Sequence, residues 1–253
     1  GHDINYISLS GALNAVGRRD RPPVPPLNLF GDYGGGTMFL IFGVLAALLE
    51  RERSGEGQVV DAAMVDGLSA MMSVFYMFQA RGQWSEQREA NMLDGGAHFY
   101  RCYETRAGKA ISVGAIEPQF YAELCEKAGL PQDAPAVQHD TAAWPDLSER
   151  FAAVFRQKTR DEWAAIFEGS DACAAPVLTI AESEEHPHLK ARGVLFRGEG
   201  EVLQAAPAPR FGRTPAPDVK APRGQGADSA EILAEAGFSE AEIAELTKNG
   251  AIT

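Results

Sequence analysis

The first residue whose type and position could support chemistry is His2. It lies just before a predicted helix that begins near Asp3, where free backbone N–H groups point outward and the local field favours negative charge. A histidine beside such donors can accept a proton while the N–H groups stabilise a developing oxyanion. Packing or capping at the start of the helix is the structural alternative for this side chain.

Asp32 is the second candidate, in the sequence GDYGGG. The glycines at 34–36 would let the backbone approach a ligand closely, and the helix predicted after them would present another positively polarised N-terminus. The segment lacks the Gly-Lys-Ser/Thr of a Walker loop, and no strand precedes it as in a dinucleotide-binding motif. A glycine-rich turn in which Asp32 caps the next helix is the open alternative.

Glu117 is the third candidate, because of the residue that follows it. Pro118 suits the first position of a helix, which makes Glu117 the expected N-cap, where Ser, Thr, Asp or Asn is usual. A poor cap at a strand-to-helix corner suggests that the carboxylate has another task. A solvated loop glutamate is the alternative. The pair His186 and His188 has no carboxylate or Cys cluster near it, so no metal site is expected.

Helices are expected to position the first two candidates. Apolar spacing predicts a helix over residues 3–16 with Asp3 as its N-cap. The stretch 21–36 is rich in Pro and Gly and is expected not to be helical, because Pro removes a backbone donor and fixes φ. Two long helices are predicted after it, over 37–55 and 61–80.

The apolar run 38–49 has twelve residues, whereas a membrane-spanning helix needs about 20. We therefore expect the helix over 37–55 to be buried in protein, and we expect no membrane span.

A small α+β region is predicted after a polar connector at 81–96. Two strands are expected first, at 98–105 and 108–116, joined by a short turn. Three helices follow, one beginning at Pro118, one over 145–158 and one beginning at Thr159, and then a returning strand at 172–180. Residues 205–227 are rich in Pro, Ala and Gly and are expected to run extended. Two short helices are predicted to end the chain, the second beginning at Ser239.

The composition is that of a globular protein with a real core, since 45% of the 253 residues are hydrophobic and 23% are charged. The net charge of −12 argues against a nucleic-acid partner, which needs a basic face. The three Cys are widely spaced without a C-x-x-C motif, which is typical of reduced thiols and predicts a cytoplasmic protein.

Several long stretches point to one family. They are GHDINYISLSG, PLNLFGDYGGGTMFLIFGVLAALLERERSGEGQVVDAAMVDG, NMLDGGAHFY, VGAIEPQFYAELCEKAGL, DACAAPVLT and HPHLKARG. Together they resemble the α-methylacyl-CoA racemases of the family III CoA-transferase superfamily over nearly the whole chain. The resemblance implies an α/β fold, the family III CoA-transferase fold, of which this chain holds a part. The expected parts are the helical portion of a large CoA-binding domain with a linker helix at 1–85, a small α+β domain at 86–190, and a return segment at 191–253 that packs on the large domain.

The resemblance also implies a reaction. Racemases of this kind invert C2 of a 2-methylacyl-CoA thioester by removing the α-proton and returning one, with a base on each face of C2. The roles of the two bases carry over to His2 and Asp32, and Glu117 is expected to associate with the histidine. Residues expected to contact the substrate or hold a base are Asp3, Tyr6, Asn28, Gly35 and Gly36, with the backbone N–H of Asp3 facing the thioester oxygen.

The same resemblance implies partners. No metal or redox cofactor is expected, and CoA is part of the substrate. An interlocked homodimer is expected, in which Glu117 acts on the other subunit, together with an N-terminal segment that supplies much of the CoA site, in cis or in trans.

Two other functions stay open from the sequence. The first is a family III CoA-transferase, in which Asp3 would be the nucleophile and form an acyl-enzyme anhydride. The presence of His2 and Asp32, two potential bases, favours the racemase instead. The second is a non-catalytic binding or assembly piece.

Overall fold

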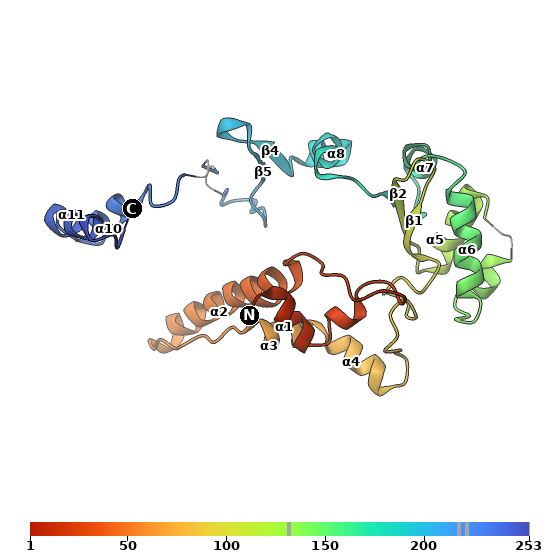
Figure 1. Ribbon diagram of the computed structural model, residues 1–253, viewed down its shortest axis with the longest axis horizontal. Coiled ribbons are helices and arrows are strands. Elements are labelled where there is room, and N and C mark those ends of the chain that lie inside the picture. Colours follow the sequence, from red (N-terminus) through yellow and green to blue (C-terminus); the bar gives the residue numbers. More distant parts are fainter. Residues whose placement is uncertain (131–132, 217–218, 221–222, 253) are drawn as a thin grey trace. The chain divides into compact units, whose positions relative to one another are not determined.

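In the computed structural model the chain folds into two units, Gly1–Val177 and Leu178–Thr253 (Figure 1). The structure describes residues 1–130, 133–216, 219–220 and 223–252. The first unit contains a helical part followed by a small domain with a three-stranded sheet. All of the site residues expected from the sequence lie in this first unit.

The helical part of the first unit consists of short helices and one long one. Its elements are α1 (Asp3–Leu9), the 3₁₀ turn η1 (Leu13–Ala15), the wide helix η2 (Leu29–Thr37), α2 (Met38–Ser54), α3 (Met64–Met71) and α4 (Ser73–Ala80).

Helix α1 is shorter than the predicted range 3–16, and its cap differs from the prediction. His2 is the N-cap residue, and its backbone N–H donates to Oδ1 of Asn5 at 2.9 Å. Asp3 is therefore the first helical residue, and the prediction that it caps the helix is wrong. After the helix, Gly11 has φ +82°, a conformation that suits glycine and interrupts the expected helix.

The glycine-rich segment is helical, so the prediction for 21–36 is wrong over its last part. Residues Leu29–Thr37 form a π-type helix, in which the N–H of Tyr33 donates to the carbonyl oxygen of Asn28, five residues back. Glycine disfavours an isolated helix, but here it allows close packing on α3, and this tertiary contact outweighs the local propensity. A π-type turn is rare and often marks a functional site.

The helix predicted over 61–80 is two helices, α3 and α4, which meet at Met72. The Ser73 hydroxyl donates to the carbonyl oxygen of Ala70 at 2.6 Å, a back-bond of the kind that bends helices. The prediction is therefore confirmed in type and wrong in continuity.

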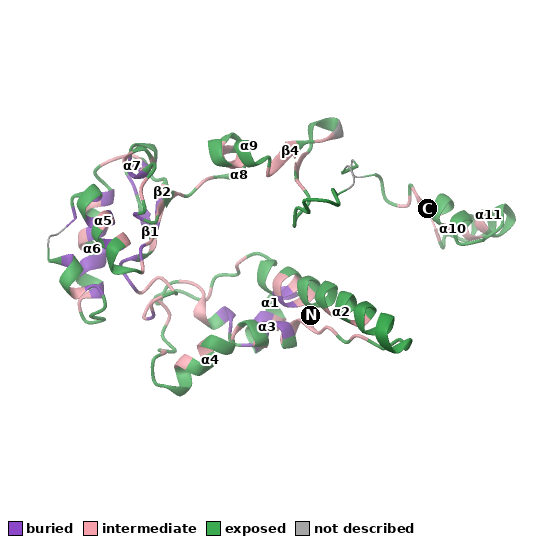
Figure 2. Cartoon of the chain, turned by 180° about the vertical axis from the view of Figure 1, so that it is seen from behind, coloured by how far each residue is buried: buried purple, intermediate pink, exposed green. Residues whose placement is uncertain are grey.

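Helix α2 is exposed, contrary to the prediction that it is buried. None of its residues is buried, and Figure 2 shows it largely green. Its exposed large apolar side chains are Met38, Phe39, Leu40, Ile41, Phe42, Val44, Leu45, Leu48 and Leu49. An apolar run indicates a surface that avoids water, but it does not identify what covers that surface. By length and composition the helical stretch Leu29–Ser54 could cross a membrane, a test that the core helices of soluble proteins also meet.

The small domain is built on an antiparallel sheet in the order β1-β2-β3, in which Ser112 of the central strand pairs with Cys102 and Ala175. Ala107 and Gly108 both have positive φ in the β1–β2 hairpin turn, which matches the twist of the strands. The elements are β1 (Tyr100–Glu104), β2 (Ala110–Gly114), α5 (Pro118–Ala128), the 3₁₀ turn η3 (Ala134–Val137), α6 (Trp144–Phe155), α7 (Arg160–Phe167) and β3 (Ala174–Pro176).

The core of the first unit lies mainly in this small domain, where buried residues are purple in Figure 2. Its largest fully buried side chains are aromatic: Trp163, Tyr121, Phe99, Phe151 and Phe155. Their rings meet edge to face or stacked, and burial of each such side chain contributes about 1.5–3 kcal/mol to stability. This packing holds the corner between β2 and α5, where Glu117 stands.

The second unit contains short elements, and none of its described residues is buried. The predicted capping box at Ser239 is confirmed, since its hydroxyl accepts from the Glu242 N–H at the start of α11. The described residues within 206–228 have no helix or strand, while 217–218 and 221–222 of the expected extended stretch lie outside the description. Its elements are α8 (Ile180–Glu185), α9 (Pro187–Arg192), β4 (Leu195–Arg197), the 3₁₀ turn η4 (Glu199–Glu201), β5 (Leu203–Ala205), α10 (Ser229–Glu235) and α11 (Glu240–Lys248).

The predicted boundaries at 85/86 and 190/191, and the packing of the return segment on the large domain, stay predictions.

Candidate active site

The centre of the candidate site is a contact between α1 and the start of η2. Asp3 is 6% exposed, and its carboxylate Oδ2 accepts hydrogen bonds from the backbone N–H groups of Gly31 and Asp32, each at 2.8 Å. A carboxylate that accepts from two backbone donors is strongly held, since charge-assisted hydrogen bonds are about twice as strong as neutral ones. The contact joins two segments that are 28 residues apart in the sequence.

His2 is brought to the same place because it directly precedes Asp3. Its backbone is fixed by the bond to Asn5, and its side chain is exposed to solvent. The structure therefore joins the two chain segments that carry the expected bases, through the bond between the Asp3 carboxylate and the Asp32 backbone. His2 is one residue before the carboxylate that holds the backbone of Asp32.

The side chain of Asp32 is held by its own turn. The Asn28 amide donates to Asp32 Oδ2 at 3.0 Å, so the contact expected between these residues is present. The hydroxyl of Thr37 donates to the Asp32 carbonyl oxygen at 2.8 Å, which closes one wide turn of η2. Asp32 is only partly exposed, and the turn leaves its carboxylate a fixed place near the surface.

Gly31 was not among the residues expected from the sequence, yet the central contact depends on it. A Cβ atom at this position would lie 2.5 Å from Asp3 Oδ2 and 2.8 Å from Asp3 Cγ. Any side chain here would push the carboxylate away. Its only sequence signal is its place directly before Asp32 in the glycine-rich segment.

The other expected glycines meet a helix in this structure. A Cβ on Gly35 would lie 2.9 Å from backbone and side-chain atoms of Leu68, and one on Gly36 would lie 3.1 Å from Met64 Cγ. Both glycines therefore allow η2 to pack on α3, and their part in binding a substrate stays a prediction. Tyr6 is half-buried on α1, with its ring beside Gly1.

Glu117 stands where the sequence predicted, and it does not act as a cap. It is the N-cap residue of α5, its side chain makes no capping hydrogen bond, and it is exposed. Its charge helps to raise the pKa of the Cys173 thiol, after the larger effect of partial burial. Within the described ranges, no hydrogen bond or ion pair links Glu117 to His2 or Asp32.

An apolar cavity of about 240 Å³ lies beside the start of η2. Phe30, the residue before Gly31, is on its wall, and Leu68 on its wall also contacts Gly35. The lining residues are Ala12, Ala15, Val16, Phe30, Leu68, Met71, Met72, Phe75, Trp84, Leu93 and Asp94. Such a cavity suits an aliphatic group.

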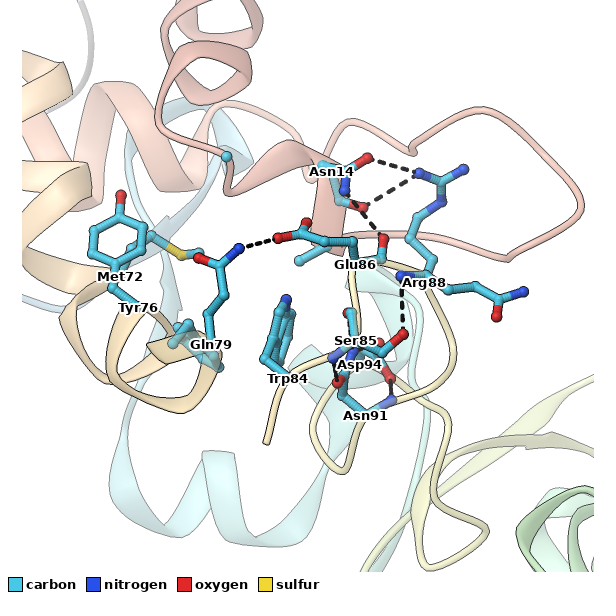
Figure 3. Close-up of a pocket in the computed structure, with 14 residues that line it drawn as sticks. Asn14, Met72, Tyr76, Gln79, Trp84, Ser85, Glu86, Arg88, Asn91 and Asp94 are labelled. Carbon is cyan, nitrogen blue, oxygen red and sulfur yellow. Dashed lines mark hydrogen bonds between the residues drawn. The ribbon is translucent and has the colours of Figure 1, made fainter. Parts of the chain in front are cut away.

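A second, more polar pocket of about 120 Å³ shares one wall with this cavity (Figure 3). Arg88 from the connector donates to the side chain and the carbonyl of Asn14, and Asn91 bonds to Asp94, as the dashed lines in the figure show. These bonds fasten the connector, and none of the residues expected to do chemistry lines this pocket. Among the described residues, no group of three His, Cys, Asp or Glu could hold a metal ion.

Comparison with known families matches residues 1–229 to CoA-transferase family III. The chain is 45% identical to the alpha-methylacyl-CoA racemase of Mus musculus over 247 residues, or 97% of this chain and 65% of the relative. It is 44% identical to the alpha-methylacyl-CoA racemase of Homo sapiens over 250 residues, or 98% of this chain and 65% of the relative. The resemblance expected from the motifs is confirmed.

The fold is also that of a solved structure. A CaiB/BaiF family protein from Brucella suis matches with a TM-score of 0.69 at 22% identity, over 93% of this chain and 62% of that chain. This likeness confirms the expected mixed helix and sheet fold. The chain spans 65% of the length of the mouse and human relatives that it matches.

Proposed function

The chain belongs to CoA-transferase family III, and from this premise we propose that it inverts C2 of 2-methylacyl-CoA thioesters by a two-base proton transfer. The similarity to two alpha-methylacyl-CoA racemases over almost the whole chain supports the proposal. The observation that carries it is the contact of Asp3 with the backbone of Asp32, because His2 directly precedes Asp3 and the contact joins its segment to the turn of Asp32, the other proposed base.

The proposed reaction needs two groups in opposite protonation states. Neutral His2 removes the C2 proton of one enantiomer, and the electron pair of the broken C–H bond passes into an enolate of the thioester. Protonated Asp32 then gives its proton to the other face of C2, which forms the inverted product. The reverse direction exchanges the two roles. The backbone N–H of Asp3 is proposed to stabilise the enolate oxygen.

The acyl group is proposed to enter the apolar cavity beside η2. Its lining is dominated by apolar and aromatic side chains, and Phe30 connects it to the turn that carries Asp32. The two Met residues on the wall are unbranched and adaptable, which suits branched acyl chains of different shape. CoA is the carrier part of the substrate, and no other cofactor is proposed.

The transferase alternative is weakened by the environment of Asp3. An attacking carboxylate must reach the thioester carbonyl, but this one is buried and already accepts two backbone hydrogen bonds. The exposed His2 and the partly exposed Asp32 are the more accessible groups. The geometry thus favours proton transfer over formation of an acyl-enzyme.

The assembly proposed with this function is an interlocked homodimer in the cytoplasm. Among the described residues the Glu117 side chain has no hydrogen bond or ion pair, and this supports a role in the site of the other subunit. An N-terminal segment, joined to this chain or supplied separately, is proposed to complete the CoA site.

The test is an assay of the chain, alone and with that segment, in the absence of any acceptor acid. One enantiomer of a 2-methylacyl-CoA should become the other, with C2 deuterium uptake in D₂O. If neither form of the protein inverts C2 and acyl exchange begins once an acid is added, the transferase replaces the racemase.

A further inference from the structure

We infer that the Asp3 carboxylate is a positioning residue that couples the two bases, so that a proton removed on one face of C2 is replaced on the other. The inference rests on the proposed function and deepens it. It concerns the side chain of Asp3, whereas the proposed contact with the thioester oxygen concerns its backbone.

The first argument is the burial and bonding of this carboxylate. Asp3 has an exposed fraction of only 6%. Its Oδ2 accepts two hydrogen bonds, from the backbone N–H groups of Gly31 and Asp32. Its Oδ1 is buried without a hydrogen-bond partner. Burial of a carboxylate is unfavourable unless hydrogen bonds replace its lost hydration. The buried position of Asp3 is therefore stable only while the N–H groups of Gly31 and Asp32 stay in place.

The second argument is the space around the contact. Among the glycines that the structure describes, Gly31 is the one whose added Cβ would meet the Asp3 carboxylate, at 2.5 Å from Oδ2. The absence of a side chain there allows the carboxylate to reach two consecutive peptide N–H groups. Gly31 and Asp3 therefore act as one unit, and changing either should move Asp32 relative to His2.

This coupling predicts how the reaction would fail. When His2 has removed a proton, its exposed imidazole can exchange that proton with solvent. The enolate then receives a proton either from Asp32, which gives inversion, or from His2, which gives exchange with retention. If Asp32 is displaced, exchange with retention should survive while inversion is lost. Displacement by about 1 Å can cost about 10²-fold in rate.

The test compares C2 deuterium exchange with inversion, starting from each pure enantiomer, in the active form of the protein. Asp3→Ala should lower inversion about 10²-fold. It should raise the ratio of exchange to inversion only for the enantiomer whose proton faces His2. For the other enantiomer, deprotonated by Asp32, exchange and inversion should fall together.

Two further variants separate positioning from folding and from nucleophilic attack. Asp3→Asn keeps an acceptor oxygen for the two N–H groups and should retain most of the inversion. Gly31→Ala should show the same altered ratio as Asp3→Ala, and the double variant should be no worse than either. Gly57→Ala is the matched control, because no atom lies within 4 Å of a Cβ at Gly57.

Each outcome decides the matter. The positioning role is overturned if Asp3→Ala lowers exchange and inversion by the same factor for both enantiomers, or if Asp3→Asn is as damaging as Asp3→Ala. A wild-type protein that shows no C2 exchange at all would instead overturn the proposed function, and this role with it.

Discussion

The Asp3 carboxylate accepts the backbone N–H of Asp32 at 2.8 Å, across 29 positions of the sequence. This bond ties the helix that follows His2 to the turn that carries the second expected base. The turn itself is stabilised by the Asn28 amide, which donates to the Asp32 side chain. The proposed proton transfer depends on the geometry of this small cluster.

Loss of either base should abolish inversion. We expect His2→Ala and Asp32→Asn each to lower the rate of C2 inversion by about 10²–10⁴-fold or more, the usual effect of one acid–base group. The controls are His188→Ala and Asp61→Asn, which change exposed residues of the same types. The measurement is inversion of a pure enantiomer by chiral chromatography. Inversion at the control rate in either base variant would remove that residue from the mechanism.

Glu117 should act across the dimer. His2→Ala and Glu117→Ala proteins should each be inactive or weak, but co-expressed chains should regain roughly a quarter of the wild-type sites, because half of a random mixture is heterodimer with one intact site. The assay is inversion after co-expression, compared with the two variants mixed without subunit exchange. If Glu117 instead acts in the site of its own chain, the co-expressed variants will recover no more activity than the unexchanged mixture.

The packing of η2 on α3 should be sensitive to one methyl group. A Cβ on Gly67 would overlap the carbonyl oxygen of Gly35, so Gly67→Ala must push the two helices apart. We expect a loss of about 1–3 kcal/mol in the free energy of unfolding. Urea unfolding of Gly67→Ala and of the control Gly57→Ala measures it. Equal stability of the two variants would contradict the close approach of η2 and α3.

The small domain should weaken in acid because of His98. This imidazole is fully buried, with Nε2 2.6 Å from the hydroxyl of Tyr121, and burial above all lowers its pKa from 6.5 to about 4. In the unfolded chain His98 binds a proton as the pH falls below about 6.5, whereas in the folded chain it does so only near pH 4. The free energy of unfolding therefore decreases as the pH falls from about 6.5 to about 4. At pH 5 the loss is about 2 kcal/mol.

Urea midpoints at about pH 7.5 and pH 5 test this prediction. His98→Gln should lose less stability on acidification than the wild type, because glutamine does not titrate. His188→Gln changes an exposed histidine and should keep the wild-type dependence. An unchanged acid sensitivity in His98→Gln would assign the effect to other groups.

The starts of helices could be predicted from the sequence where they depend only on residues close by in the chain. Pro118 begins α5, and Thr159 caps α7 through a reciprocal bond with Glu162, as expected. Capping is decided within one turn of helix, so sequence spacing is enough to predict it.

Contacts between distant segments could not be predicted in the same way. The glycine-rich segment is helical where it packs on α3, and this tertiary contact outweighs the low helix propensity of its glycines. The direction of the Asp3 side chain likewise depends on peptide groups 28 and 29 positions away. The sequence named His2, Asp32 and Asp3 as candidates, but it could not predict that the Asp3 carboxylate connects the other two.

The central claim is a transfer between two different bases, and the position of deuterium early in the reaction tests it most directly. A pure enantiomer of a 2-methylacyl-CoA is incubated in D₂O, and both enantiomer pools are analysed by mass spectrometry at low conversion. The account predicts that the inverted product carries deuterium at C2 from the start, while the remaining substrate gains deuterium far more slowly. Inverted product that retains its original protium would mean that one group carries the proton across, and it would contradict the two-base account.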